Sequence, residues 1–209
     1  RKGRDTLMAE EKMQEQIMRA VQDEEDLNGK IFSGEKMEST DFPGVGFHGC
    51  RLEDCRLLNC NAEGCYFEDC VLKNCDFSNT SFVNCCFRRV KMISCKLLGT
   101  SFSGAILDGT EFKLCPCRLA EFPSAKFRHT VFSGCGLTEC SFQECELHGT
   151  VFSGCGMNKC SFLHTSLRGI DLRSDETRGL TVSGPELHGA IVTPAQACEL
   201  SRYLGLVIK

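Results

Sequence analysis

The chain has 209 residues, with 24 Lys and Arg against 28 Asp and Glu, and a formal net charge of −4. This balance excludes the strong basic excess that is typical of nucleic-acid-binding domains, and no apolar run reaches the ~18 residues that a membrane-spanning helix needs. The composition is unusual in its 17 Cys and 15 Phe and in its lack of Trp.

Residues 1–26 have the pattern of an amphipathic helix, with charged residues on one side and apolar residues on the other. Asp5 or Thr6 is suited to begin the helix as its N-cap. We expect the helix to cover the open end of the structure that follows, since the ends of stacked repeats need a cap. A partner-binding helix is the alternative. The predicted apolar side consists of Leu7, Met13, Ile17, Met18, Ala20 and Val21.

Residues 27–192 follow a period of five without a slip in register. Of the 34 positions spaced by five from Leu27 to Val192, 15 are Phe, 11 are Leu and three are Met, so every Phe of the chain lies in this register. The positions two before each centre hold 14 of the 17 Cys, and the positions two after hold 15 of the 20 Gly. Chance does not produce this distribution, so the segment is a repeat array.

A period of five matches neither a helix, at 3.6 residues, nor a strand, at two. It fits a chain that turns a corner every five residues. The large centre and the small residue two before it then point inward from a short extended segment. A Gly, Asn or Asp at the corner tolerates a positive φ. Stacked coils share one continuous core, which no single unit has alone.

The units resemble those of the pentapeptide-repeat family, as in Cys75–Asn79 and Thr100–Gly104. The resemblance implies an all-β fold, a right-handed quadrilateral β-helix with four units per coil and about eight and a half coils, with short α-helices at both ends. We expect distorted faces at two places. Cys117 replaces a large centre, and the stretch 173–178 puts Asp175 inward and Thr177 at a centre.

With four units of five per coil, equivalent residues of successive coils stack, and six cysteines from Cys55 to Cys155 form one column. Disulfides along it would need Cβ atoms closer than parallel side chains hold them. A zinc site needs four converging ligands, which a straight row does not give. We favour the third interpretation, in which Cys is a small buried apolar residue. Free thiols imply a reducing compartment and a cytoplasmic location. Cys86, at an outward position, is the predicted reactive thiol.

Residues 193–209 predict a short helix and an apolar tail. Thr193 and Pro194 fit an N-cap and first helical position, and Gly205 fits the end of the helix. The C-terminal region resembles the end of quinolone-resistance pentapeptide proteins of the Qnr type, which implies a homodimer formed through this end. The implied interface residues are Leu200, Tyr203, Leu204, Leu206 and Ile208.

Nothing in the sequence indicates an enzyme, a cofactor or a metal site. The chain lacks the nucleophile elbow, the P-loop and the HExxH motif. His48, His148 and His188 fall in one outward column, but Glu, Arg and Asp share that column and indicate a solvated stripe of alternating charge.

The Qnr resemblance implies a partner, DNA gyrase or topoisomerase IV, which the rod would protect from quinolones or from peptide toxins by mimicking duplex DNA. We therefore expect no membrane and no direct DNA binding. The repeat carries 19 acids and 17 bases, with basic residues concentrated between 81 and 130, which is a poor copy of a phosphate backbone. The alternative is a rigid scaffold for another protein partner.

Overall fold

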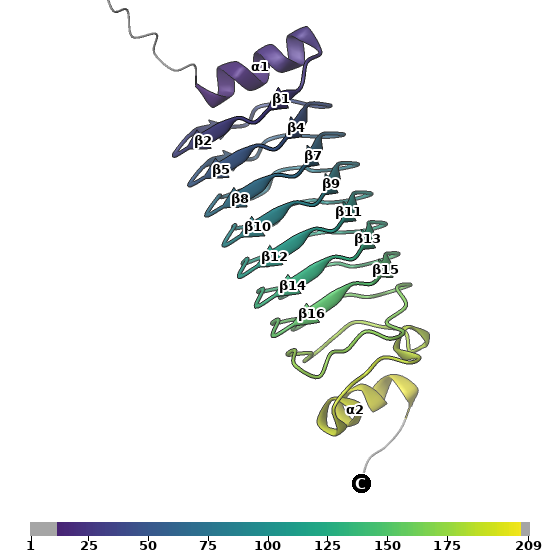
Figure 1. The fold of residues 1–209 in the computed structure, drawn as a ribbon. Helices are drawn as coiled ribbons and strands as arrows, with labels where there is room; N and C mark the ends of the chain where they lie inside the picture. Colours follow the sequence, from purple (N-terminus) through teal and green to yellow (C-terminus); the bar gives the residue numbers. More distant parts are fainter. Residues whose placement is uncertain (1–11, 206–209) are drawn as a thin grey trace, which may run out of the picture.

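The computed structural model describes residues 12–205, apart from the side chain of Leu204. The chain forms a four-sided column of stacked coils with a helix at each end (Figure 1). Each coil consists of four pentapeptide units, because every strand pairs in parallel with the strand four units further along, as Phe47 does with Phe67. The predicted class, a β-helix built from pentapeptides, is confirmed.

The first face of the column is a seven-stranded parallel sheet. Its strands are β1 (Leu27–Asn28), β4 (Gly46–His48), β7 (Tyr66–Glu68), β9 (Cys86–Arg88), β11 (Ile106–Asp108), β13 (Lys126–Arg128) and β15 (Glu146–His148). The second face is another seven-stranded sheet. It consists of β2 (Ile31–Ser33), β5 (Arg51–Glu53), β8 (Val71–Lys73), β10 (Lys91–Ile93), β12 (Glu111–Lys113), β14 (Val131–Ser133) and β16 (Val151–Ser153).

The other two faces have little regular strand. The third begins with β3 (Lys36–Glu38) and β6 (Arg56–Leu58) and continues through isolated bridges to Glu176. The fourth face consists only of bridges, which run coil by coil from Asp41 to Thr181. The segments of this fourth face are 41–44, 61–64, 81–84, 101–104, 121–124, 141–144, 161–164 and 181–184.

The column has fewer regular turns than the repeat count predicted. From β1 to β15 the first face advances by one coil at each strand, so the strand-bearing part has about six turns instead of eight and a half. After Ser153 the chain continues to stack, but through bridges such as that between Gly156 and Glu176. The expected distortion thus falls in the region of Asp175 and Thr177. At Cys117 the stacking is regular, because its N–H still donates to the Gly136 carbonyl at 2.8 Å.

Phenylalanine rings fill the core in stacked ladders. Along the fourth face, Phe102 lies between Phe82 and Phe122, with ring centroids 5.4 and 4.9 Å apart. Rings of adjoining faces meet edge to face, as Phe82 and Phe87 do at 5.5 Å, and so do rings of opposite faces, as Phe102 and Phe112 do at 6.1 Å. Both arrangements are favourable for aromatic pairs, and all of these rings are fully buried.

The small inward residues bond to the backbone of the preceding coil. The Cys75 thiol donates to the Leu52 carbonyl at 3.3 Å, and the Thr100 hydroxyl donates to the Phe77 carbonyl at 2.8 Å, both 23 residues back. Cys and Thr are therefore interchangeable at this position, because each is small and carries one donor. All 17 cysteines are free thiols, as expected.

Corners from Gly29 to Gly189 have positive φ, as the repeat predicted, with the exception of Ser174. Gly104 has φ 65° and Asn79 has φ 56°. Bulky residues also occupy such corners, among them Leu114 at 55° and His129 at 49°. These corners accept a non-glycine residue at some cost in backbone strain.

A helix lies across each end of the column (Figure 1). At the N-terminal end, α1 (Met13–Asp23) buries Met13, Ile17 and Ala20 in the common core, whereas Met18 is 40% exposed, contrary to expectation. The proposed start at Asp5 or Thr6, and Leu7, lie outside the described residues.

The C-terminal end has three short elements: η1 (Pro185–Leu187), α2 (Pro194–Leu200) and η2 (Ser201–Leu204). The Thr193 hydroxyl accepts the Gln196 N–H at 3.2 Å, and the Gln196 side chain accepts the Thr193 N–H at 2.8 Å. Gly205 ends η2 with φ 68°. The predicted cap and stop are both confirmed.

Candidate interaction surfaces

Charge is distributed unevenly over the four faces. The fourth face contains no Lys or Arg in any of its eight segments. It carries four exposed carboxylates, Asp41, Glu63, Glu121 and Glu144, and none of the four forms an ion pair with another described residue. Ser or Thr takes the first position of five of the eight segments, at residues 81, 101, 141, 161 and 181.

This distribution places the negative charge of the repeat on one side. Residues 27–192 have 19 acids and 17 bases, a net charge of −2. The fourth face contributes −4, so the other three faces and their corners, with 15 acids and 17 bases, are net positive by two. The mid-column basic residues all lie on those three faces, and the fourth face has none at any level.

Several of these basic residues are paired with acids one coil away. Arg89 contacts Asp69 at 2.7 Å and Glu68 at 2.8 Å. Lys96 lies 3.3 Å from Asp76, Arg118 lies 3.1 Å from Glu139, and Lys126 lies 3.4 Å from Glu146. The Arg89 guanidinium, as the main cause, lowers the pKa of both Glu68 and Asp69. These exposed pairs neutralise the charge of the mid-column basic residues more than they stabilise the fold.

The histidine column is the solvated stripe that the sequence predicted. His48 lies between Asp26, at 3.2 Å, and Glu68, at 3.5 Å. Glu68 in turn lies 3.7 Å from Arg88. Within residues 12–205, no group of three or more His, Cys, Asp or Glu side chains is placed to hold a metal ion.

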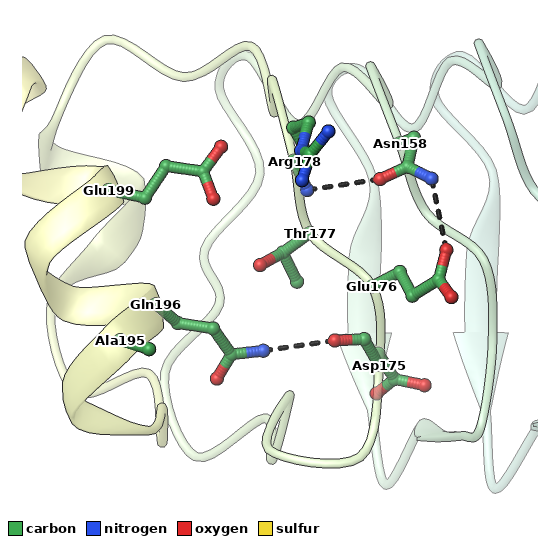
Figure 2. A pocket seen from close by; sticks show the side chains of 8 residues that line it. All are labelled: Asn158, Asp175, Glu176, Thr177, Arg178, Ala195, Gln196 and Glu199. Carbon is green, nitrogen blue, oxygen red and sulfur yellow. Dashed lines mark hydrogen bonds between the residues drawn. The ribbon is translucent and has the colours of Figure 1, made fainter.

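A polar pocket of about 470 Å³ lies between the end of the third face and α2 (Figure 2). Its polar groups bind mainly to each other. The Asn158 amide donates to Glu176 at 3.1 Å and accepts the Arg178 N–H at 3.2 Å, and the Gln196 amide donates to the Asp175 carbonyl at 3.0 Å. The lining is completed by Thr177, Ala195 and Glu199.

Neither Cys nor His lines the pocket. Several of its side chains are engaged in hydrogen bonds within the fold, among them Asn158, Gln196 and Glu199.

Two carboxylates near this end, Asp175 and Glu186, are buried. The sequence indicated that Asp175 points inward, but it gave no sign that Glu186 is buried. Glu186 accepts the His164 N–H at 2.9 Å and the Ser183 N–H and hydroxyl at 3.0 and 2.8 Å. Burial alone would raise the pKa of Glu186, but these hydrogen bonds lower it to about 2. Burial raises the pKa of Asp175, against the hydrogen bond from the Cys155 N–H.

The predicted dimer residues divide into those packed on this chain and those not described. Leu200 is 6% exposed within the chain's own core, and the Tyr203 hydroxyl donates to the Leu180 carbonyl. The side chain of Leu204, and Leu206 and Ile208, lie outside the described residues. The dimer stays a prediction, and Leu200 can contribute little to it without rearrangement.

Cys86 is not the most accessible thiol. It is half-buried, and burial raises its pKa, which disfavours the reactive thiolate. Cys198, on α2, is the one exposed cysteine of the 17. Its position outside the repeat was the available signal in the sequence.

None of the helices in the described part of the chain is long and apolar enough to cross a membrane. Two family models match the chain. The model described as "Pentapeptide repeat region" covers residues 45–122, and the model for "Pentapeptide repeats (8 copies)" covers residues 120–155 and 135–173. No curated protein sequence matches.

One solved structure shows the same fold, and others resemble the chain less. Full-length QnrB1, a plasmid-mediated fluoroquinolone resistance protein, aligns over 87% of this chain and 97% of its own, with a TM-score of 0.64 and 21% identity. A trypsin-treated, singly substituted form of QnrB1 has a TM-score of 0.47 and 22% identity, over 88% of this chain and 97% of its own. HetL from the cyanobacterium Nostoc has a TM-score of 0.30 and 13% identity, over 87% of this chain and 99% of its own. The four-unit coils, the single Phe register and the two matching models together show that the chain belongs to the pentapeptide-repeat family.

Proposed function

We propose that this chain acts without catalysis, as a rod that binds a protein partner through its fourth face, and that the partner is DNA gyrase or topoisomerase IV. The observation that carries the proposal is the absence of Lys and Arg from all eight segments of that face. A basic protein surface can approach it along the whole column without meeting a like charge.

The resemblance to QnrB1 supports the choice of partner. QnrB1 is a fluoroquinolone resistance protein, and its fold aligns with nearly the full length of this column. Binding of this chain to a type II topoisomerase would protect that enzyme from quinolones or from peptide toxins. The free thiols throughout the core suit a reducing compartment, so we place this action in the cytoplasm.

The fourth face carries far fewer negative charges than duplex DNA of the same length. Between Asp41 and Thr181 it covers seven coil spacings, about 34 Å. Duplex DNA of that length carries ~20 phosphate charges, against four carboxylates here. Recognition would therefore depend mainly on contacts along this face, which has no Lys or Arg. The electrostatic contribution would be modest. A rigid scaffold for a different basic partner is the alternative that this low charge density favours.

The experiment is a gyrase supercoiling assay with purified protein, with and without a fluoroquinolone. We expect low micromolar protein to restore supercoiling in the presence of drug. Glu63→Lys and Glu121→Lys, on the fourth face, should weaken the effect, whereas Glu38→Lys, an exposed acid on the third face, should not.

Absence of both protection and inhibition would reject gyrase as the partner and leave the scaffold. Equal loss of activity in Glu38→Lys and Glu63→Lys would reject the fourth face as the contact surface, since both reversals change the net charge by the same amount.

A further inference from the structure

The hydrogen bonding between coils is interrupted at one level of the column. In every earlier coil, the N–H of a corner residue donates to the next coil, as His129 does to the His148 carbonyl and Gly134 to the Ser153 carbonyl, both at 2.9 Å. Among the described residues, no backbone hydrogen bond of this kind joins 145–154 to 165–174 on the first and second faces. We call this interruption the ladder break.

Side chains span the break in place of the backbone. The Cys145 N–H donates to the Thr165 hydroxyl at 2.8 Å, at the corner where the first face begins. The Gly154 N–H donates to the Ser174 hydroxyl at 3.3 Å, at the corner where the second face ends. A third such bond, from the Cys155 N–H to the Asp175 carboxylate at 2.6 Å, lies where the third face begins. Of the three, only the Gly154 bond is exposed to solvent, and at 3.3 Å it is long for a hydrogen bond.

The ladder break affects only two of the four faces. On the third face, the Glu176 N–H donates to the Cys155 carbonyl at 2.9 Å and the Met157 N–H donates to the Glu176 carbonyl at 2.8 Å. On the fourth face, the Phe162 N–H donates to the Thr181 carbonyl at 2.9 Å. The same two coils are thus joined on one side of the column and separated on the other.

The coil below the break is bonded to the one that follows it. The Leu167 N–H donates to the Glu186 carbonyl at 2.9 Å, and the Leu172 N–H donates to the Ile191 carbonyl at 2.8 Å. Gln196, on α2, donates to the Leu172 carbonyl at 2.7 Å. On the first and second faces, residues 165–205 are therefore bonded to one another. On the same faces they have no backbone hydrogen bonds to the column above.

Two buried polar atoms at this level lack a hydrogen-bond partner. The Thr150 hydroxyl is unpaired, although its counterpart one coil earlier, Thr130, donates to the Leu107 carbonyl at 2.9 Å. One carboxylate oxygen of Asp175 is also unpaired. Both residues are more than nine-tenths buried. An unpaired buried polar atom costs free energy that contact with water would recover.

From these observations we infer that residues 165–205 form a hinged C-terminal unit, which opens from the column at the first and second faces while the third and fourth faces hold it. Opening breaks no backbone ladder on the open side and hydrates Thr150 and Asp175. Such units, with few bonds to the rest of a fold, open at lower free energy than the whole protein unfolds. The intact bridges at Glu176 and Thr181 form the hinge.

Native-state alkylation of the buried cysteines tests the opening in the intact chain. Cys145 lies above the break, at the corner where the first face begins, and Cys115 and Cys135 lie in coils bonded on all sides. Cys155 lies at the hinge, where its carbonyl accepts the Glu176 N–H. With peptide mapping by mass spectrometry, we expect Cys145 to react at least tenfold faster than Cys115, Cys135 and Cys155. Equal rates would overturn the hinge, because all four thiols would then be exposed only by global unfolding.

Hydrogen exchange locates the open side. The amides of Leu147, Gly149 and Phe152 should exchange at least a hundredfold faster than those of Phe127, His129 and Phe132, their counterparts one coil earlier. The amides of Met157 and Phe162, at the hinge, should remain protected. Loss of protection at Met157 and Phe162 together with Leu147 would indicate local unfolding of the whole end and would contradict a hinge.

A matched pair of substitutions separates the break from general instability. Thr150→Val removes an unpaired hydroxyl and should slow the alkylation of Cys145 severalfold. Thr130→Val removes a hydroxyl with a partner and should leave the ratio of Cys145 to Cys135 reactivity unchanged or bring it closer to one through faster global unfolding. Faster Cys145 alkylation in Thr150→Val would contradict the proposed origin of the opening.

Discussion

Single residues in this column act mainly through two kinds of contact, ring against ring and donor against carbonyl. Phe102 illustrates the first, because its ring stacks between two others in a fully buried ladder. Cys75 illustrates the second, because its thiol bonds to a carbonyl of the preceding coil. The regularity of both contacts means that a change at one coil can be compared with an unchanged counterpart in the next.

Removing one interior ring should destabilise the column strongly. Phe102→Ala deletes a buried ring with neighbours above and below, and we expect a loss of about 3–5 kcal/mol of unfolding free energy. Ser103→Ala, at the next outward position, should change it by less than about 0.5 kcal/mol. Denaturant unfolding measures both. A negligible effect of Phe102→Ala would refute the inward assignment of the Phe register.

Glu186 should make stability depend on acid pH. Its pKa of about 2 in the fold lies below the ~4.3 of an unfolded Glu. Its stabilisation, about 2–3 kcal/mol, is therefore fully present above pH ~4.3 and is lost as pH falls towards 2. Glu186→Gln should lower the unfolding free energy at pH 7 and approach the parent near pH 2.

The variant must be compared with the parent protein, because the contribution of Asp175 to stability changes with pH in the opposite direction. Its raised pKa stabilises the fold at low pH and ceases to do so as pH rises through the folded value. Both proteins contain Asp175, so its contribution cancels. A difference between variant and parent that stayed constant from pH 2 to pH 7 would show that the Glu186 charge has no role.

At the scale of elements, helix α2 is attached to the column by hydrogen bonds and by the buried Leu200 side chain. Gln196 accepts the Thr193 N–H and donates to the Leu172 and Asp175 carbonyls, and Glu199 accepts the Gly179 N–H at 3.1 Å. The helix has only seven residues, and helices of that length are marginal without tertiary contacts. Its position at the end of the column thus depends on these contacts, among which Gln196 makes the most hydrogen bonds, more than on its own propensity.

Replacement of the Gln196 amide should loosen the helix. Gln196→Ala removes the acceptor of the Thr193 N–H and both bonds from the amide to the column, whereas Thr193→Ala removes only the hydroxyl that accepts the backbone N–H of Gln196. We expect Thr193→Ala to cost about 1 kcal/mol and Gln196→Ala to cost more, with faster amide exchange in 194–200. A larger cost for Thr193→Ala would contradict the role given to Gln196.

At the scale of the whole molecule, nearly every thiol is sealed inside the column. Fifteen of the 17 cysteines are buried, Cys86 is half-buried and Cys198 is exposed. Thiol titration of the native protein should give one or two fast-reacting groups, with Cys198 the first, and about 17 groups in denaturant. A large deficit after unfolding without reductant would reveal disulfides.

Assembly is the second property of the whole molecule that can be measured directly. The Qnr resemblance predicts a homodimer through the C-terminal end, so light scattering at micromolar concentration should give twice the 23.2 kDa of one chain. A monomeric mass would reject the dimer. If the monomer protected gyrase, the proposed partner would be retained and only the dimer would be rejected.

The sequence by itself determined the column, because its information is local and repeated. The five-residue pattern around the 34 centres specifies which residues point inward and which form corners. It consists of a large apolar residue, a small donor two positions before it and a turn residue two positions after it. The two terminal helices followed from amphipathic spacing and from the cap at Thr193. The coils can stack once four such units complete each coil.

The tertiary structure alone decided how well each coil fits on the next. The inward Asp175 marked a distortion in the sequence, but the register runs through 145–174 without a slip and does not show the ladder break, the unpaired Thr150 hydroxyl or the end of regular strands after Ser153. Glu186 was one polar residue among many until the fold brought the His164 N–H to it from 22 positions away. These features depend on contacts between coils, whose geometry is set by the core beneath them and by the helix at the end.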